Sequence, residues 1–398
     1  MSMAEFWPTS ASNHNKTQAM RKIAILLIGL VLSSCGLLGG GLYLEVSNPL
    51  DFERKGEIVE VEWDRIGRAF ISAEKVVVLN NDGVQTPSQV LFDEDGNPTK
   101  LLFTADVEAG SSAIYNIRRG EREPYPTQAF GRYVPERLDD YAWENNLTAY
   151  RIYGPRLESP QTQGVDVWVK STSKIIIDEW FARNDYHHNY GEGMDCYKVG
   201  NTLGGGALAI IDGGKLALAG NYTKQQCTAN GPIRTSAEFE YAPVNIGDRM
   251  VTMRRKISLD ANSRFTYQEY TFEGFEGKLE VAAGIILHDV KARSFGSEYV
   301  AITEPASDSK DPDTDGDISL AVILQGAVST TEIDGHIAAT RHIQAGETIR
   351  MWNGSAWSNA DMQCHDAWLR EVEQMKQRIE SPLHSRFIKR REVTKRDN

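Results

Sequence analysis

The sequence is poor in several features that define large classes of proteins. It has 4 cysteines in 398 residues, and none of them shows the C-x-x-C spacing typical of zinc or thioredoxin-like sites. The glycine-rich stretch GNTLGGGA at 200–207 matches neither G-x-G-x-x-G nor a Walker A loop, so nucleotide binding has no support. The apolar run within 21–34 is shorter than the about 20 residues that span a bilayer.

Positive charge is also scarce. The chain has 43 Lys and Arg against 55 Asp and Glu, a formal net charge of −12. This balance argues against nucleic acid as a partner, because a polyanion would be repelled. The proportions of 41% hydrophobic and 25% charged residues are those of an ordinary globular protein and exclude fibrous or wholly disordered chains.

The beginning of the chain reads as a targeting signal. Arg21 and Lys22 precede the short apolar run, and Ser33 and Ser34 then precede Cys35 as in a bacterial lipobox. We expect residues 1–34 to be an N-terminal extension and lipoprotein signal peptide, and 35–45 to be an anchor and tether. A lipid on Cys35 would hold the protein to the bacterial outer membrane, in the periplasm or at the cell surface. A buried core helix is the alternative for this run.

The other three cysteines are Cys196, Cys227 and Cys364. Because three is an odd number, they cannot pair completely. Cys196 and Cys227 could form a disulfide in an oxidising periplasm, and buried free thiols are the alternative.

The pattern from residue 42 onward is one of short β-like runs separated by Gly, Asn and Asp turns about ten residues apart. This spacing predicts a mainly β protein, a large antiparallel β-sandwich or barrel. One helix is expected, at Asp366–Ser381, because its apolar residues recur at helical spacing and Pro382 follows it. We predict a single β-rich catalytic domain at 46–385 and a basic flexible tail at 386–398.

Groups suited to acid–base chemistry are densest at 185–200, which reads DYHHNYGEGMDCYKVG. Tyr186, His187 and His188 are candidates for the proton-transfer groups, since Tyr and His side chains serve as general acids and bases. Glu192 and Lys198 are candidate substrate contacts in the same segment. A polar turn between two strands is the alternative interpretation.

Two expected strands carry arginines on a polar face. Alternation at 147–153 places Ala149, Arg151 and Tyr153 on one face, and Arg234 heads a polar face at 233–241. An arginine on such a face can hold a carboxylate by two hydrogen bonds, so Arg151 is a candidate catalytic residue and Tyr153 and Arg234 are candidate substrate contacts. Solvated surface arginines are the alternative.

The stretch at 132–145 combines an indole with charged and amide groups, as sugar-binding surfaces do. Its candidate contacts are Arg137, Trp143 and Asn145. Trp352 and Trp357 could add further stacking platforms, although any one tryptophan can equally pack in the core.

The acidic loop DPDTDGDIS begins like a calcium-binding EF-hand loop at Asp311. Its twelfth position is Val322, where a bidentate glutamate is required, so an acidic surface loop is favoured over a calcium turn. We expect no metal and no other cofactor.

Several stretches together resemble a family of secreted bacterial proteins from polysaccharide-utilisation loci, a former domain of unknown function that includes the ulvan oligosaccharide dehydratase. They are SNPLDFERKGEIVEV, VPERLDDYAWENNLTAYRIYGP, DEWFARNDYHHNYGEGMDCYKVG, NGPIRTSAEFEY and the tryptophan-containing helix ending ESPL, and they span about 46–384. The resemblance implies a β-sandwich similar to the mutarotase-like supersandwich of many polysaccharide lyases. Tyr190 and GNTLGGGA depart from the family pattern.

The resemblance also implies a reaction, dehydration of a non-reducing-end uronic acid to a 4,5-unsaturated uronate. This β-elimination needs a base at C5, a cation for the carboxylate and an acid for the leaving hydroxyl. A lyase that cleaves a 4-linked uronide needs the same parts. A non-catalytic glycan-binding lipoprotein would need only the tryptophans. A glycosidase would need two opposed carboxylates, for which Glu144 and Glu192 are candidates.

Overall fold

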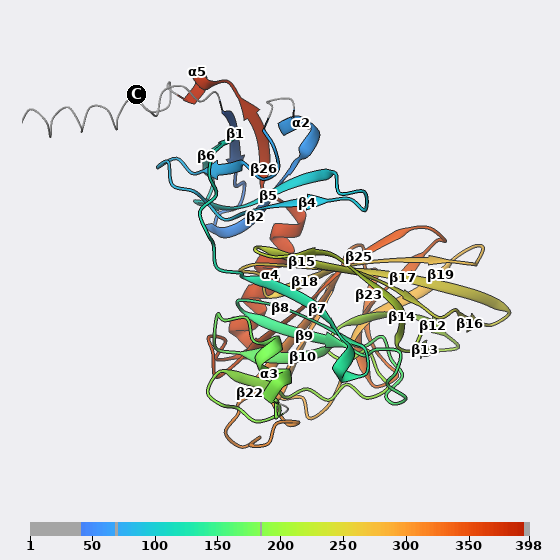
Figure 1. The fold of residues 1–398 in the computed structure, drawn as a ribbon. Helices are drawn as coiled ribbons and strands as arrows, with labels where there is room; N and C mark the ends of the chain where they lie inside the picture. Colours follow the sequence, from blue (N-terminus) through green and yellow to red (C-terminus); the bar gives the residue numbers. More distant parts are fainter. Residues whose placement is uncertain (1–40, 68–70, 184, 394–398) are drawn as a thin grey trace, which may run out of the picture.

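The computed structural model describes residues 41–67, 71–183 and 185–393. Two small antiparallel sheets form an N-terminal β-unit, drawn at the top of Figure 1. The first sheet has the order β26 (His384–Ile388), β1 (Leu42–Ser47), β6 (Ser112–Arg119), β3 (Val76–Leu79). The second has the order β2 (Arg54–Glu62), β5 (Pro98–Val107), β4 (Ser88–Phe92). The short helix α2 (Trp63–Gly67) follows β2.

Three further sheets form the larger part of the molecule, and their named strands pair in antiparallel fashion. A nine-stranded sheet contains β14 (Tyr222–Asn230), β15 (Arg234–Tyr241), β17 (Arg249–Asp260), β18 (Phe265–Glu273), β25 (Thr348–Trp357), β22 (Asp317–Leu324), β21 (Tyr299–Pro305) and β20 (Ala292–Phe295), with β16 (Val244–Ile246) beside β17.

Two five-stranded sheets accompany it. One has the order β11 (Gly193–Asp195), β10 (Asp166–Lys170), β9 (Thr148–Ile152), β8 (Asp140–Asn145), β7 (Ala129–Val134). The other has the order β13 (Lys215–Ala217), β12 (Ala207–Asp212), β19 (Leu279–Ile286), β24 (His336–Ile343), β23 (Ser329–Ile333). The prediction of a mainly β, sandwich-like protein is confirmed.

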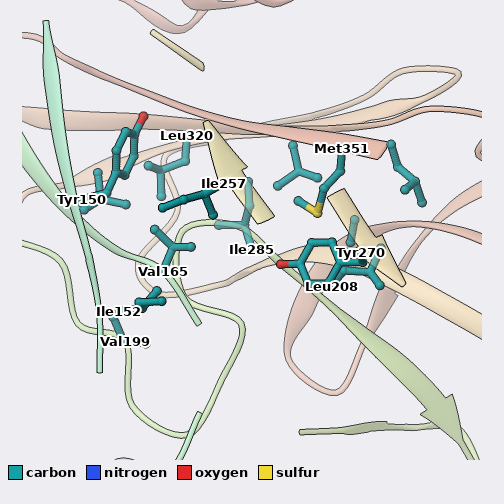
Figure 2. Packing of buried hydrophobic residues seen from close by; sticks show 14 of the residues in the cluster. Tyr150, Ile152, Val165, Val199, Leu208, Ile257, Tyr270, Ile285, Leu320 and Met351 are labelled. Carbon is teal, nitrogen blue, oxygen red and sulfur yellow. The ribbon is translucent and has the colours of Figure 1, made fainter. Parts of the chain in front are cut away.

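The main hydrophobic core lies between the nine-stranded sheet and the two five-stranded sheets. Figure 2 shows side chains from all three meeting there, among them Ile152, Leu208, Ile257 and Met351. Strand alternation supplies them, because one face of each strand carries apolar residues such as Ala237 and Phe239 of β15. The N-terminal β-unit has a separate apolar cluster around Leu44, Phe103 and Ile117. Residues 46–385 therefore contain two separate cores. That they form a single domain stays a prediction.

The predicted C-terminal helix is confirmed as α4 (His365–Glu380). Trp368 and Val372 are buried on the outer face of the nine-stranded sheet, where the Trp368 ring stacks on Phe265 with centroids 5.4 Å apart. The other helical segments are short: η1 (Pro135–Arg137), α3 (Ile177–Arg183) and α5 (Arg390–Val393). Within the described ranges, no helix is long and apolar enough to cross a membrane.

Two predicted boundaries are wrong. The tail was expected to begin at 386, but β26 runs through Ile388 and pairs with β1 from Tyr43↔Ile388 to Ser47↔His384. For the same reason the last residues of the expected tether belong to a strand. Sequence inspection overlooked this pairing because its two strands come from opposite ends of the chain. Cys35 and residues 1–34 lie outside the described residues.

The three cysteines that the structure describes are free. Cys196 is buried, as the thiol alternative requires, whereas Cys227 and Cys364 are exposed. The Cys196–Cys227 disulfide is therefore absent from the structure.

Candidate functional site

Arg151 is the centre of a buried charged network on the face of β8–β11 that points away from the main core. Its guanidinium lies 2.6 Å from Asp166, 3.1 Å from Asp195 and 3.8 Å from Asp140. The three acids come from three neighbouring strands, and Arg151 is only 4% exposed. We call Arg151 and these three aspartates the arginine network.

The arginine network contains more carboxylates than cations. Burial raises the pKa of Asp140 to about 6, although Arg151 opposes the shift. Burial likewise raises the pKa of Asp166 and, more strongly, that of Asp195, to which the charge of Asp166 adds. Three buried carboxylates around one guanidinium therefore resist ionising together.

Aromatic rings enclose the same guanidinium. The Arg151 Cζ atom lies 5.3 Å from the ring centroid of Tyr153, 5.4 Å from that of Trp168 and 5.5 Å from that of Tyr186. Tyr186 stacks on Trp168 with centroids 5.3 Å apart, and Arg151 Nη1 donates to its hydroxyl at 3.4 Å. Arg151 is thus enclosed by the protein's own groups and is not an open carboxylate clamp, contrary to the sequence interpretation. Its contacts hold Tyr186 and Asp195 in place.

His187 lies at the surface end of this network. Its Nδ1 atom is 3.0 Å from the backbone oxygen of Asp195 and 3.9 Å from the Asp195 carboxylate. Since a carbonyl oxygen can only accept, Nδ1 carries the hydrogen, and in the neutral ring Nε2 keeps its lone pair. The side chain is 41% exposed, so this imidazole can reach a ligand. Its ring centroid lies 4.9 Å from that of Tyr186.

His188 points to different neighbours. Its Nδ1 atom lies 3.2 Å from the carboxylate of Asp311, and its ring packs edge-on against Tyr190 with centroids 4.5 Å apart. The acidic loop containing Asp311 also bonds to the segment through Lys310 N–H, which donates to the backbone oxygen of His187 at 3.1 Å. The structure thus gives the two adjacent histidines different neighbours.

The acidic loop is a packing element in this structure. Asp315 is buried and accepts a 3.0 Å hydrogen bond from Asn189. Among the described residues, no group of three or more His, Cys, Asp or Glu side chains is arranged to hold a metal ion.

A histidine from outside this segment also contacts it. His288 Nδ1 lies 2.8 Å from the buried carboxylate of Glu304, and its ring packs edge-on against Tyr197 at 5.3 Å. The hydrogen bond to Glu304 raises the pKa of His288 against the opposing effect of burial. No local sequence signal joins the pair, because the contact depends on how β21 packs beside the loop that follows β19.

Lys198 is exposed and lies close enough to His288 for its charge to oppose protonation of that ring. Within the described ranges Lys198 has no ion-pair partner. The segment at 185–198 thus carries a partly exposed imidazole, His187, and an exposed ammonium group, Lys198, and it contacts His288.

Arg234 lies away from this segment and serves the contact between the two parts of the molecule. It forms ion pairs with Asp260 and, across to the N-terminal β-unit, with Glu60, each at 2.5 Å. Gln89 of the same unit accepts hydrogen bonds from the backbone N–H groups of Ile233 and Arg234. The predicted role of Arg234 as a carboxylate clamp is corrected accordingly, because its donors are already bonded.

The predicted sugar-stacking surface at 132–145 is wrong for its central residues. Trp143 is completely buried, and its indole N–H donates to Thr266 at 3.0 Å. Asn145 is also buried and donates to the backbone oxygens of Asp260 and Ser263. Trp357 is 3% exposed, which makes it a core residue.

The remaining candidates have separate environments. Glu144 is buried 2.6 Å from Lys170 and accepts from the N–H groups of Ile176 and Ile177, so it holds the start of α3. Glu192 pairs with Lys174 at 2.6 Å, and Arg137 is exposed on η1. Glu144 and Glu192 are therefore not two open carboxylates facing one site.

Comparison with known proteins shows the family to which the chain belongs. A family model described as a domain of unknown function (DUF4861) matches residues 46–384, so the chain belongs to that family. The chain is also 31% identical over 271 residues to "Uncharacterized protein P7" of Formosa agariphila, an alignment that covers 62% of this chain and 67% of that protein.

Solved structures show likeness of fold. An alpha-mannosidase from Enterococcus faecalis V583 matches with a TM-score of 0.51 and 8% identity, over 88% of this chain. The match covers 46% of the mannosidase, so this chain spans about half its length. The periplasmic domain of Thermotoga maritima YidC matches with a TM-score of 0.31 and 10% identity, over 61% of this chain and 96% of that domain.

Proposed function

We propose that this protein is a carbohydrate-active lyase that dehydrates the non-reducing-end uronic acid of acidic, ulvan-type oligosaccharides by β-elimination. The observation that carries the proposal is the setting of His187: its side chain is 41% exposed and its Nδ1 is held by the backbone oxygen of Asp195, which leaves the lone pair of the neutral ring on Nε2. This is the arrangement that a general base requires.

The reaction assigns a task to each group. His187 Nε2 removes the proton from C5, the C5–H electrons form the C4–C5 double bond, and the C4–O bond breaks. The departing hydroxyl takes a proton and leaves as water. His288 is suited to supply that proton, because Glu304 raises its pKa. Lys198 is suited to pair with the uronate carboxylate, whose negative charge grows as the proton leaves.

The arginine network is not part of the reaction, and its proposed role is to keep His187 in position. It holds the chain that carries Asp195 and Tyr186, and through them the ring of His187. Placement of a base within hydrogen-bond reach of its proton matters as much as its pKa. Tyr186 is accordingly a positioning residue in this proposal, and His188 is outside it.

The test is turnover of saturated ulvan-type oligosaccharides followed by mass spectrometry and near-ultraviolet absorbance of the unsaturated uronate. Loss of one water without fragmentation supports a dehydratase, whereas two fragments indicate the alternative, a uronide-cleaving lyase. His187→Ala should lower turnover by about 10²–10⁴-fold. The matched control is His342→Ala, which removes an exposed imidazole on β24. Binding without any product would favour the non-catalytic glycan-binding lipoprotein.

The proposed location is the periplasm or the cell surface, with the lipid on Cys35 as the membrane anchor. Cys35→Ala should leave an unprocessed or soluble precursor in membrane fractionation. A variant that fractionates with the membrane as the wild type does would contradict the anchor.

A further inference from the structure

The outer face of the nine-stranded sheet carries two ordered rows of side chains that the proposed reaction does not use. Because neighbouring strands are antiparallel and in register, side chains on one face line up across them. The first row runs across β15, β17, β18 and β25 as Ser236, Ser258, Tyr267 and Trp352. The second, next to it, runs as Glu238, Lys256, Glu269 and Arg350.

This face is the floor of a groove. One cavity of about 610 Å³ lies over it, between the floor and the β4–β5 hairpin of the N-terminal β-unit, where Phe92 and Lys100 form the roof. A second of about 480 Å³ continues along α4, past Met375 and Ile379. The two cavities share Tyr267 and Trp352 in their linings. Their volumes are those of small-molecule sites, which occupy about 300–1,000 Å³.

A third cavity extends the groove in the other direction. It has a volume of about 500 Å³ and shares Lys256 and Glu269 with the first. The three cavities therefore lie one after another over the sheet, each sharing lining residues with the next, and together they offer more room than one sugar ring needs. An extended chain molecule fits this shape better than a compact one.

The centre of the floor has the chemistry of a sugar platform. The rings of Tyr267 and Trp352 lie side by side with centroids 5.2 Å apart and an angle of 42° between them. Both side chains are only partly buried. Aromatic rings stack on the C–H faces of pyranose rings, while Ser258, partly exposed in the same row, offers a hydroxyl group to sugar hydroxyls.

The charged row adds cations that remain reachable. Arg350 is 50% exposed, and the ion pair that it makes among the described residues, to Glu269, is 3.6 Å long. Lys256 is 44% exposed and lies 3.3 Å from Glu238. Arg254 is exposed in the third cavity. The row alternates acidic and basic groups, so Lys256 and Arg350 are its two cations. Arg350 is two residues from Trp352 on β25 and shares its face, so its charge lies beside the aromatic platform and favours an anionic group of a ligand there.

We propose that this groove binds an extended uronic-acid-containing oligosaccharide, with its rings on Tyr267 and Trp352 and a carboxylate on Arg350. The ligand class follows from the groove itself and does not depend on the elimination reaction. The groove and the His187 segment share no lining residue. The protein would thus hold an acidic glycan at a site separate from the one that we propose for chemistry.

The test is calorimetric titration of the full chain carrying His187→Ala with a saturated ulvan hexasaccharide. In that background, Arg350→Ala and Trp352→Ala should each weaken binding by about 10-fold, a loss of one charge-assisted or stacking contact. The matched control is Arg293→Ala, since Arg293 is 52% exposed and also pairs with one glutamate. It should leave the affinity within about twofold.

The carboxyl-reduced form of the same hexasaccharide should bind more weakly than the native form. Unchanged affinity in both groove variants, with melting temperatures showing that they are folded, would overturn the proposal, as would absence of binding. Because the measurement is made in a variant without the proposed base, its outcome is separate from that of the dehydration assay. Failure of dehydration with intact groove binding would reject only the proposed reaction.

Discussion

The arginine network and the groove floor use the same kinds of side chain in opposite ways. In the network, Arg151 is 4% exposed and forms ion pairs with three aspartates, so its charge holds neighbouring groups in place. On the groove floor, Arg350 is 50% exposed and its ion pair with Glu269 is 3.6 Å long, so its charge stays accessible to solvent. The difference shows that an arginine's function here depends on what covers its strand and not on the strand pattern.

The largest expected effect separates these two arginines by stability. Arg151→Met leaves buried carboxylates without their cation and should lower the free energy of unfolding by about 3–5 kcal/mol. Arg350→Met should change it by about 0–1 kcal/mol, as for an exposed ion pair. Urea unfolding of both variants measures the two values. Equal losses would contradict the contrast between the two regions.

A smaller effect compares the two faces of β18. Thr266 is completely buried and accepts from the indole of Trp143, whereas Thr271 faces the groove. Thr266→Val preserves shape but leaves the indole N–H unpaired, which should cost about 1–3 kcal/mol of unfolding free energy. Thr271→Val should stay within about 0.5 kcal/mol. Similar values for both would mean that the faces are not divided as described.

A further expected effect is in the pH dependence of stability, which should have opposite signs in the two regions. Burial raises the pKa of Asp140 from 3.8 to about 6, so the folded protein holds a proton that the unfolded chain releases, and this stability is lost as pH rises through 6. For Glu60, burial is outweighed by Arg234 and Lys100, which lower its pKa from 4.5 to about 2. Its contribution is present above 4.5 and is lost as pH falls toward 2.

Unfolding curves of Asp140→Asn and Glu60→Gln across this pH range test the two signs. Asp140→Asn should remove part of the stability loss that the wild type shows between pH 4 and 6. Glu60→Gln should remove part of the stability loss that it shows below pH 4.5. If the free energy of unfolding of both variants changes with pH as steeply as that of the wild type in both pH ranges, neither group has the shifted pKa.

The alternation of side chains between the two faces of a strand was predictable from the sequence. What packs against each face of the sheet was not. The pattern at 147–153 correctly placed Arg151 and Ala149 opposite Tyr150 and Ile152. It could not show that the register Asp166↔Arg151 brings a counter-charge from the next strand. The partners of a buried charge are set by strand pairing, which no local spacing reveals.

The same limit explains the tryptophan error. Trp143 is flanked by acids and looked like an exposed platform, but its strand is buried on both sides, by the main core and by α3. The residues around Trp352 in the sequence gave a weaker indication of a sugar-binding surface, yet Trp352 is the tryptophan that lines a cavity. The C-terminal helix was recognised because its 3.6-residue periodicity is local and complete.

The central claim is that a base takes the proton from C5 of a uronate, and a substrate deuterated at C5 tests it most directly. The account predicts a product that has lost the deuterium together with the C4 hydroxyl, formed more slowly than from the protonated substrate, and almost no product from His187→Ala. A product that keeps the deuterium, or full activity without His187, would contradict it.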